Sequence, residues 1–278
     1  MASITDHVVE GLKYPFNDIK KLLGCGILFA LISALSVFMS TKSLDIFRYC
    51  VHLAENTNTT LSHIPLSQLP AGDIYIWVGL AILSLIISLF IFGYQYRVVR
   101  FSIDRKEDLP GFDDIVSMLV NGIKYFIVIV AYNIIPALIL AGGIILVGNS
   151  SVLLIISLIS ALLFIIAFFL QIMALNNMVA HDSLKKAFDI REITDNISNL
   201  GWGKYIGIII FTIIVYMIIM VAVNFILSLI TGIFIAAISN QAFFVSIFIA
   251  VIEGLFIDSY GAIFYNRVFG SVYRESIK

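Results

Sequence analysis

The sequence predicts an all-α integral membrane protein with six transmembrane helices. Its 278 residues are 60% hydrophobic and 13% charged, and the mean hydropathy is +1.04, whereas soluble domains are roughly half apolar and a quarter charged. The second observation is a set of six apolar windows, each long enough to cross a bilayer. The third is the placement of Lys and Arg in alternate connections. We therefore expect a single membrane domain over 1–278.

The six windows are defined by their length. A bilayer core about 30 Å thick requires about 20 apolar residues in helical conformation. Such windows occur at about 22–40, 74–97, 122–147, 151–175, 205–230 and 241–266. The third and fourth are joined by Gly148-Asn149-Ser150, which is typical of a tight turn. The connection from Thr231 to Gln241 is itself apolar and is expected to lie at the membrane interface.

The basic residues predict the orientation of these helices. Of the 17 Lys and Arg residues, all but Lys42 and Arg48 fall at the termini or in the second-to-third and fourth-to-fifth connections. Cytoplasmic loops are enriched in Lys and Arg. We therefore predict a multi-pass protein of the cell (plasma) membrane with both termini in the cytoplasm.

The connection at about 41–73 is then expected on the outer face. Apolar residues recur within it at helical spacing, at Leu44, Phe47, Val51 and Ala54. This pattern predicts a short separate helix on the outer surface, followed by loop.

Amphipathic stretches precede the odd-numbered crossings. In the clearest, Leu109 to Tyr125, the residues Pro110, Asp113 and Asp114 suit the first turn of a helix and are followed by apolar residues three and four apart. Related stretches lie near 10–19 and 184–205. We expect each to form a cytoplasmic elbow helix that leads into an out-and-back hairpin.

The elbows and hairpins predict three hairpin units, at about 1–100, 101–178 and 179–278. The even-numbered crossings have related endings, which are Gly93-Tyr94-Gln95-Tyr96-Arg97, Asn176-Asn177, and Tyr260-Gly261 through Tyr265-Asn266-Arg267. All three hairpins would share one orientation, so the repeat would be parallel, unlike the inverted repeats of many transporters.

Several stretches also carry a family resemblance. They are Leu12-Lys13-Tyr14-Pro15-Phe16-Asn17-Asp18, Gly93-Tyr94 through Arg100, Leu109-Pro110-Gly111-Phe112-Asp113-Asp114, Asn121-Gly122-Ile123-Lys124 and Ala187-Phe188-Asp189-Ile190-Arg191-Glu192-Ile193. Together they resemble the prokaryotic, mainly archaeal, family of polytopic membrane proteins catalogued as domain of unknown function 4013. The resemblance covers nearly the whole chain. It implies a membrane protein without an assigned activity and carries over no functional residues.

Two carboxylates, Glu253 and Asp258, fall inside the sixth window. Ionisable side chains at membrane depth are costly and tend to face a bundle interior or a cavity, which makes Glu253 a candidate proton or cation relay. The alternative is a neutral carboxylic acid hydrogen-bonded within the bundle. Residues five apart on a regular helix point about 140° from each other. We therefore expect no shared site, which disfavours a paired acid–base mechanism, and we expect Asp258 to pair with Arg267 or an elbow lysine.

Pro136 lies mid-way along the third window, where it removes the backbone hydrogen bond to the Tyr132 carbonyl and predicts a kink. Tyr132 and Asn133 then lie beside a freed acceptor, and Tyr216 and Asn224 of the fifth window would extend a polar interior. With the two carboxylates these residues form the candidate intramembrane polar site. The alternative for each is structural hydrogen bonding between helices.

No pattern in the sequence predicts catalysis. A phosphate-binding glycine loop, a nucleophile elbow and a zinc-protease helix are all missing, and His52 with Glu55 lacks the further ligands of a zinc site. His181-Asp182-Ser183 contains the residue types of a triad but is expected to be a helix cap. We predict no catalytic residues, no metal and no cofactor. The basic residues are spread along membrane edges, which predicts no nucleic-acid partner.

Aromatic and basic residues form a predicted headgroup belt at the inner membrane edge. Its members are Tyr94, Tyr96, Arg97, Arg100, Lys124, Tyr125, Trp202, Lys204 and Tyr205. We expect a non-enzymatic protein that binds or organises lipid or another hydrophobic small molecule, with membrane lipids, a second copy or another membrane protein as partners. The alternative is a small transporter or channel that uses Glu253. The third hypothesis is an intramembrane enzyme.

Overall fold

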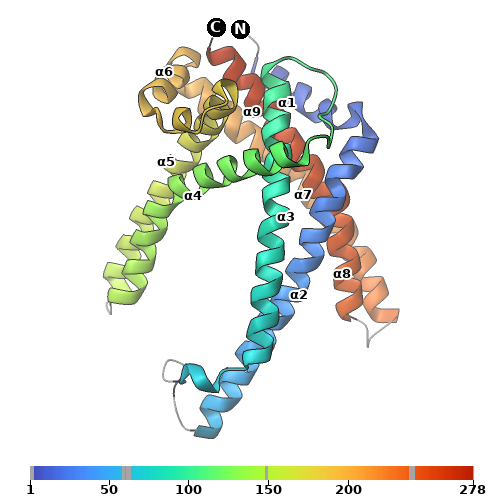
Figure 1. Cartoon of the computed structure of the whole chain (residues 1–278), viewed down its shortest axis with the longest axis vertical. Helices are drawn as coiled ribbons and strands as arrows, with labels where there is room; N and C mark the ends of the chain where they lie inside the picture. The colour runs from blue at the N-terminus through green and yellow to red at the C-terminus, as the bar shows by residue number, and fades with distance from the viewer. Residues whose placement is uncertain (1–2, 58–59, 61–63, 148–149, 238–241, 278) are drawn as a thin grey trace. The chain divides into compact units, whose positions relative to one another are not determined.

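The computed structural model describes residues 3–57, 60, 64–147, 150–237 and 242–277. Within these ranges the chain is helical without strands, and six helical segments are long and apolar enough to cross a membrane (Figure 1). The six lie in α2 (Ile19–Thr57), α3 (Ala71–Ile103), α4 (Ile115–Leu146), α5 (Ser150–His181), α7 (Trp202–Ala237) and the succession of α8 (Ala242–Ile252), the π-helix η5 (Glu253–Asp258) and α9 (Ser259–Ser276). The shorter helices are α1 (Ile4–Lys13), η1 (Tyr14–Asn17), η3 (Leu66–Gln68), η4 (Leu184–Phe188) and α6 (Ile190–Leu200). The predicted six-helix membrane fold is confirmed.

The contacts divide the chain into two compact units, each described by itself. The larger unit comprises Met1–Leu22, Leu89–Met220 and Tyr260–Lys278, and the smaller unit comprises Leu23–Ser88 and Val221–Ser259. The predicted grouping into three hairpin units is a different division and stays a prediction. Gly148 and Asn149 of the predicted tight turn, and residues 238–241 of the connection before α8, lie outside the described residues.

The predicted separate helix on the outer surface is wrong, because α2 continues without a break to Thr57. Residues 41–57 contain neither Gly nor Pro, so no residue there interrupts the helix. The extension is bonded to α3 within the smaller unit, where Lys42 Nζ donates to Asp73 Oδ1 at 2.8 Å. The apolar spacing therefore marked the second half of one long helix.

The predicted elbow at Leu109 to Tyr125 is not a separate helix. The first six residues form a loop, and α4 begins at Ile115 after Asp114, whose side chain accepts from the Ser117 N–H at 3.1 Å. Figure 1 shows that α4 is bent. Pro136 lies within this helix and lacks the N–H that would bond to the preceding turn. The elbow is therefore the first part of a bent helix.

The other two amphipathic stretches overlap short helices: the stretch near 10–19 covers the end of α1 and all of η1, and the stretch at 184–205 includes η4 and α6. Both α1 and α6 have an N-cap of their own. Ser3 and Asp6 form a capping box at α1, and Asp189 accepts from a backbone N–H in the first turn of α6. The apolar faces of both helices pack on the larger unit, with Val8 and Ile193 fully buried. Their position at the membrane surface stays a prediction.

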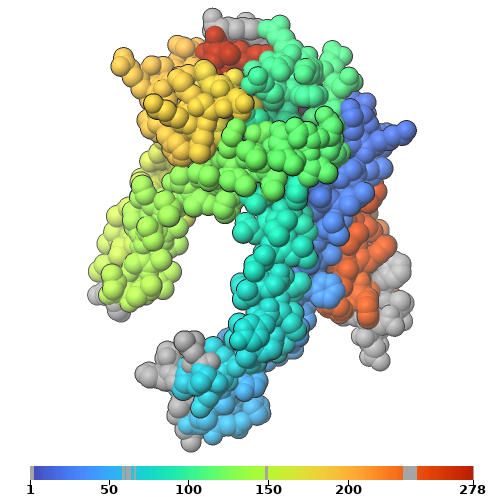
Figure 2. Space-filling view, in the orientation of Figure 1, coloured from blue at the N-terminus to red at the C-terminus, as the bar shows by residue number. Residues whose placement is uncertain are grey.

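The core of the larger unit consists of aromatic and aliphatic side chains from α3, α5, α7 and α9, and its largest buried members include Tyr94, Tyr205, Phe264 and Tyr273. Helices α3 and α4 approach at backbone contact, because a Cβ atom at Gly93 would overlap the Met118 carbonyl and one at Gly122 would overlap the Leu89 carbonyl. Apolar side chains cover the outside of the α4–α5 hairpin, the green-to-yellow arm of Figure 2. Such a surface is suited to contact with lipid.

Candidate functional site

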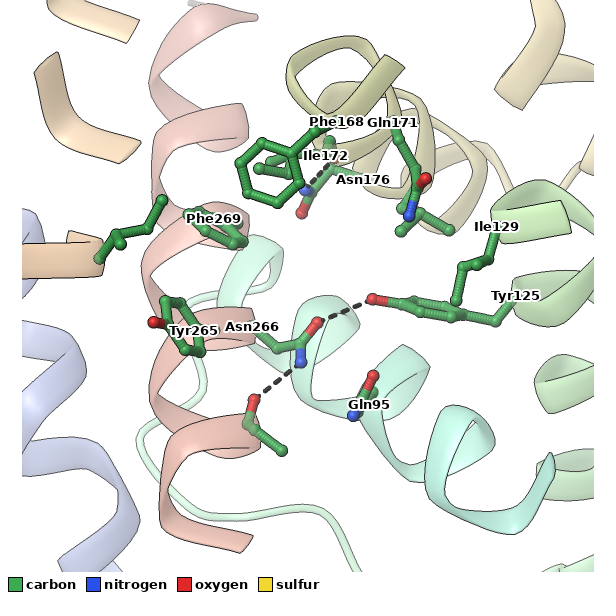
Figure 3. Close-up of a pocket in the computed structure, with 13 residues that line it drawn as sticks. Gln95, Tyr125, Ile129, Phe168, Gln171, Ile172, Asn176, Tyr265, Asn266 and Phe269 are labelled. Carbon is green, nitrogen blue, oxygen red and sulfur yellow. Dashed lines mark hydrogen bonds between the residues drawn. The ribbon is translucent and has the colours of Figure 1, made fainter. Parts of the chain in front are cut away.

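A pocket of about 340 Å³ lies within the larger unit, among α3, α4, α5, α7 and α9 (Figure 3). This volume falls in the range of roughly 300–1,000 Å³ typical of small-molecule sites. The lining residues are Gln95, Tyr125, Ile129, Phe168, Gln171, Ile172, Leu175, Asn176, Ile213, Ala262, Tyr265, Asn266 and Phe269. The five from α5 recur at steps of three and four residues, so one face of that helix forms a wall of the pocket.

Asn176 provides the most unusual polar group of the pocket. The residue is 3% exposed, and its Nδ2 donates to the Ile172 carbonyl at 2.7 Å. Its Oδ1 is buried and has no hydrogen-bond partner within the described part of the chain, and Figure 3 shows it directed into the open space. An unpaired buried acceptor costs about 1–3 kcal/mol. Asn176 therefore directs an unpaired acceptor into the pocket.

Asn266, on the opposite wall, is already paired. Tyr125 donates its hydroxyl to Asn266 Oδ1 at 3.0 Å, and Asn266 Nδ2 donates to the Ala262 carbonyl at 2.7 Å (Figure 3). These two bonds link α4 to α9 and hold the amide in one orientation. Asn266 and Tyr125 therefore fix the shape of the pocket, and their bonded atoms are not available to a ligand.

Two glutamines add further amides. Gln171 Oε1 accepts from Asn133 Nδ2 at 2.6 Å across the α4–α5 contact, which leaves the Gln171 Nε2 hydrogens as donors. In Figure 3 this nitrogen faces the pocket, and Gln95 of α3 lies on the far side. The pocket therefore contains both acceptors and donors.

The pocket carries no formal charge on its described lining residues, whose polar groups are only amides and phenols. Its remaining walls are aliphatic and aromatic, with the Tyr265 and Phe269 rings stacked at a centroid distance of 5.7 Å. A mostly apolar surface with a few directed polar groups is typical of sites for small hydrophobic molecules.

A second cavity of about 310 Å³ lies between the α4–α5 hairpin and the segment η4–α6. Tyr132 and Phe188 stack beside it with ring centroids 6.2 Å apart, and the Tyr132 hydroxyl donates to the Ala187 carbonyl at 2.7 Å. Because its one polar side chain is bonded to the protein, this cavity offers mainly apolar surface.

The carboxylates Glu253 and Asp258 are the two ends of the π-helix η5 in the smaller unit. A π-helix closes its hydrogen bonds between residues five apart, so these two residues are one wide turn apart. The expectation that they point about 140° from each other is therefore wrong, because it assumed a regular α-helix. Among the described residues no group of three or more His, Cys, Asp or Glu side chains could hold a metal ion.

The π-helix packs closely on α2. A Cβ atom at Gly254 would lie 2.6 Å from the Phe29 carbonyl oxygen, and one at Gly26 would overlap the Leu255 carbonyl. Close approach through small residues is common between membrane helices. Asp258 Oδ2 is 3.5 Å from Ser33 Oγ of α2, whereas Arg267, its predicted partner, pairs with Glu10 at 2.7 Å.

The residues of the predicted intramembrane polar site are divided between the two units. Asn224, with the two carboxylates, belongs to the smaller unit, and Tyr132, Asn133 and Tyr216 belong to the larger. Asn133 supports a pocket residue, Tyr132 borders the apolar cavity, and Tyr216 packs on Gly261 of α9. A role for this set in one relay stays a prediction.

The sequence prediction missed all four pocket amides, including Gln171, and three of them, Gln95, Asn176 and Asn266, share a feature. All three lie in the related endings of the even-numbered crossings, which were interpreted only as evidence of a repeat. A polar residue in each of these endings was the signal that could have identified them. The candidate amides Asn133 and Asn224 are identified by their position away from the ends of a membrane window, whereas these three lie at the ends of theirs.

Most residues of the predicted headgroup belt are bonded to the protein itself. Arg97 and Arg100 donate to backbone carbonyls, at distances of 2.7–3.2 Å, and Lys204 pairs with Glu275 at 2.6 Å. Tyr205 is fully buried, whereas Trp202 is 44% exposed. Binding of lipid headgroups by this belt stays a prediction.

Asp182 joins two further members of the belt. The Tyr96 hydroxyl and Lys124 Nζ both reach Asp182 Oδ1, at 2.7 and 3.0 Å. These two bonds, that of Tyr96 first, lower the pKa of the Asp182 carboxyl. The predicted helix cap at His181–Ser183 is confirmed as the C-terminal cap of α5, because Asp182 has a left-handed backbone conformation (φ 47°) and the Ser183 N–H bonds to the Met178 carbonyl at 3.1 Å. The Asp182 side chain takes no part in this cap and makes the tertiary contact instead.

Six helical segments able to cross a membrane, with an uncharged pocket among five helices, define a multi-pass membrane protein. The chain belongs to the family described as protein of unknown function (DUF4013), whose model matches residues 76–228. The resemblance inferred from the motifs is confirmed over this part, which is shorter than the nearly full length expected. The match includes the pocket residues from Gln95 to Ile213 and excludes those of α9. No curated protein and no solved structure matches the chain.

Proposed function

We propose that the protein binds a lipid or another uncharged hydrophobic small molecule in the pocket of the larger unit, without catalysing a reaction. The observation that supports this most directly is the buried, unpaired Oδ1 of Asn176 in a pocket of about 340 Å³. A bound molecule would supply the missing hydrogen bond, and the apolar walls would contact the adjoining apolar part of that molecule.

The chemistry of the lining also favours binding over catalysis. The described lining residues include no carboxylate, His, Lys, Cys or Ser, which are the usual nucleophiles and general acids or bases. In the predicted topology, with both termini in the cytoplasm of a cell-membrane protein, Gln95, Asn176 and Asn266 lie near the inner ends of their helices. A lipid of the inner leaflet is therefore the proposed occupant and partner.

The test of binding is a substitution that fills the pocket. Ala262→Phe introduces a ring into the lining, and Ala161→Phe, at an exposed position of α5, is the matched control. We expect native mass spectrometry of the purified chain to show a defined lipid on the wild type and on Ala161→Phe, and none on Ala262→Phe. Equal retention by all three proteins would contradict the proposal.

A proton or cation relay through Glu253 is the second candidate function. It is favoured by the π-helix, which puts Glu253 and Asp258 one wide turn apart and which occurs frequently at functional sites. In proteoliposomes with an imposed ion gradient, Glu253→Gln should abolish ion-linked flux, and Glu55→Gln at an exposed position of α2 should not. Unchanged flux in Glu253→Gln would exclude the relay.

A further inference from the structure

We infer that the molecule held in the pocket is an uncharged lipid whose headgroup donates a hydroxyl hydrogen bond to Oδ1 of Asn176. This inference rests on the proposed function and narrows it to one headgroup chemistry. It follows from the orientation of Asn176, from the absence of charge on the described lining, and from the donors left on Gln171.

The orientation of Asn176 requires a donor. Its Nδ2 is used by the Ile172 carbonyl at 2.7 Å, so the oxygen is the end of the amide that faces the pocket (Figure 3). A carbonyl oxygen only accepts hydrogen bonds. An ester or ether oxygen of a lipid cannot satisfy it, whereas a hydroxyl can.

The lining requires an uncharged headgroup. A phosphate transferred into this pocket would lose its hydration without gaining a cation, which is strongly unfavourable. The cations adjacent in sequence to pocket residues are already paired: Arg267 bonds to Glu10, and Lys124 bonds to Asp182. Neither is a lining residue, so the pocket selects against anionic lipids.

The donors on Gln171 suit the oxygen atoms of the same headgroup. Asn133 Nδ2 donates to Gln171 Oε1 at 2.6 Å, and this bond fixes the orientation of the Gln171 amide. The Nε2 of that amide faces the pocket (Figure 3). Tyr125 and Asn266 bond to each other and do not compete for the ligand. A glycerol carrying one free hydroxyl and two esters provides both the donor for Asn176 and acceptors for Gln171.

Three probes with the same tails test this chemistry on the purified full-length chain: 1,2-dioleoylglycerol, its 3-O-methyl ether and dioleoyl phosphatidic acid. Native mass spectrometry at equal probe concentrations should show about tenfold tighter binding of dioleoylglycerol than of the other two, the size of one hydrogen bond to a buried acceptor. Asn176→Leu removes the acceptor, so the affinity of this variant for dioleoylglycerol should fall to its affinity for the methyl ether. Asn121→Leu, outside the pocket on α4, should keep the preference.

The outcomes separate this inference from the proposed function. If all three probes bind the wild type equally and Ala262→Phe blocks them all, the pocket binds lipid but hydroxyl recognition is overturned. A preference for phosphatidic acid or the ether, or an unchanged preference in Asn176→Leu, also overturns it. If no probe binds and Ala262→Phe changes nothing, both proposals fail. The comparison of probes on the wild type remains decisive even if Asn176→Leu does not fold.

Discussion

The phenol of Tyr273 donates a hydrogen bond of 2.7 Å to Oδ1 of Asn177, and both side chains are buried. Asn177 also donates its Nδ2 to the Lys186 carbonyl at 2.9 Å, so its amide is paired at both ends. The bond joins α9 to α5 directly beside Asn176. It therefore ties together two walls of the pocket.

Replacing Tyr273 with Phe leaves a buried acceptor unpaired. We expect Tyr273→Phe to lower the free energy of unfolding by about 1–3 kcal/mol, measured by denaturant titration in detergent. Tyr75→Phe is the control, because Tyr75 is 76% exposed and should change stability little. An unaltered stability of Tyr273→Phe would show that the bond does not hold the two helices.

Gly122 and Gly142 of α4 make a matched pair. A Cβ atom at Gly122 would overlap the Leu89 carbonyl oxygen, whereas nothing lies within 4 Å of one at Gly142. Backbone cannot move aside as a flexible side chain can, so Gly122→Ala should strongly reduce the yield and thermal stability of the folded protein. Gly142→Ala should be neutral or stabilise the helix by about 0.5–1 kcal/mol. The reverse order of stabilities would rule out the close α3–α4 contact.

The contacts of Asp182 predict that the stability of the fold depends on pH. The Tyr96 hydroxyl and Lys124 hold its pKa below the ordinary value of about 3.9, so the folded chain binds a proton there less readily than the unfolded chain. The stability it contributes is present above the unfolded pKa and is lost as the pH falls through the lowered folded pKa. At pH 7 the melting temperature of Asp182→Asn should therefore be lower than that of the wild type. This difference in melting temperature should shrink below about pH 4. Asp195→Asn, at an exposed site, should show no such convergence.

The sequence was sufficient to predict the six membrane helices because the apolar length of each span is a local property. It was not sufficient for the pocket, since Gln95, Asn176 and Asn266 are far apart in the chain and their meeting depends on which helices pack together. For the same reason the sequence does not predict the hydrogen bonds of Asp182, because its partners Tyr96 and Lys124 lie on other helices.

The π-helix was missed for a different reason. Its register changes the relation between Glu253 and Asp258, and apolar periodicity does not reveal one wide turn within a helix. The apolar spacing in residues 44–54 is the same for a separate helix and for the second half of a long one, and residues 41–57 contain no helix breaker to separate the two.

Arg267 and Glu10 provide the last prediction. The guanidinium bonds to Glu10 Oε1 at 2.7 Å and to the Lys106 carbonyl at 2.7 Å, and it lies 4.2 Å above the Tyr14 ring. Because Arg267 is 5% exposed, Arg267→Met should lower the free energy of unfolding by about 3 kcal/mol. Glu10 is more exposed, so Glu10→Gln should lower it by about 1 kcal/mol.

The two substitutions should not be additive. Once Arg267 is gone, Glu10 keeps only the longer contact with Arg274 Nη2 at 3.7 Å. Glu10→Gln should therefore lower the free energy of unfolding by less in the Arg267→Met background, with a coupling energy of about 1–2 kcal/mol. Four denaturant titrations, on the wild type, the two single variants and the double variant, measure that coupling. A coupling of zero would mean that Arg267 stabilises the fold through the Lys106 carbonyl and the Tyr14 ring, and that the polar contacts of His7 with Ser271 and Glu275, rather than the Arg267–Glu10 pair, join α1 to α9.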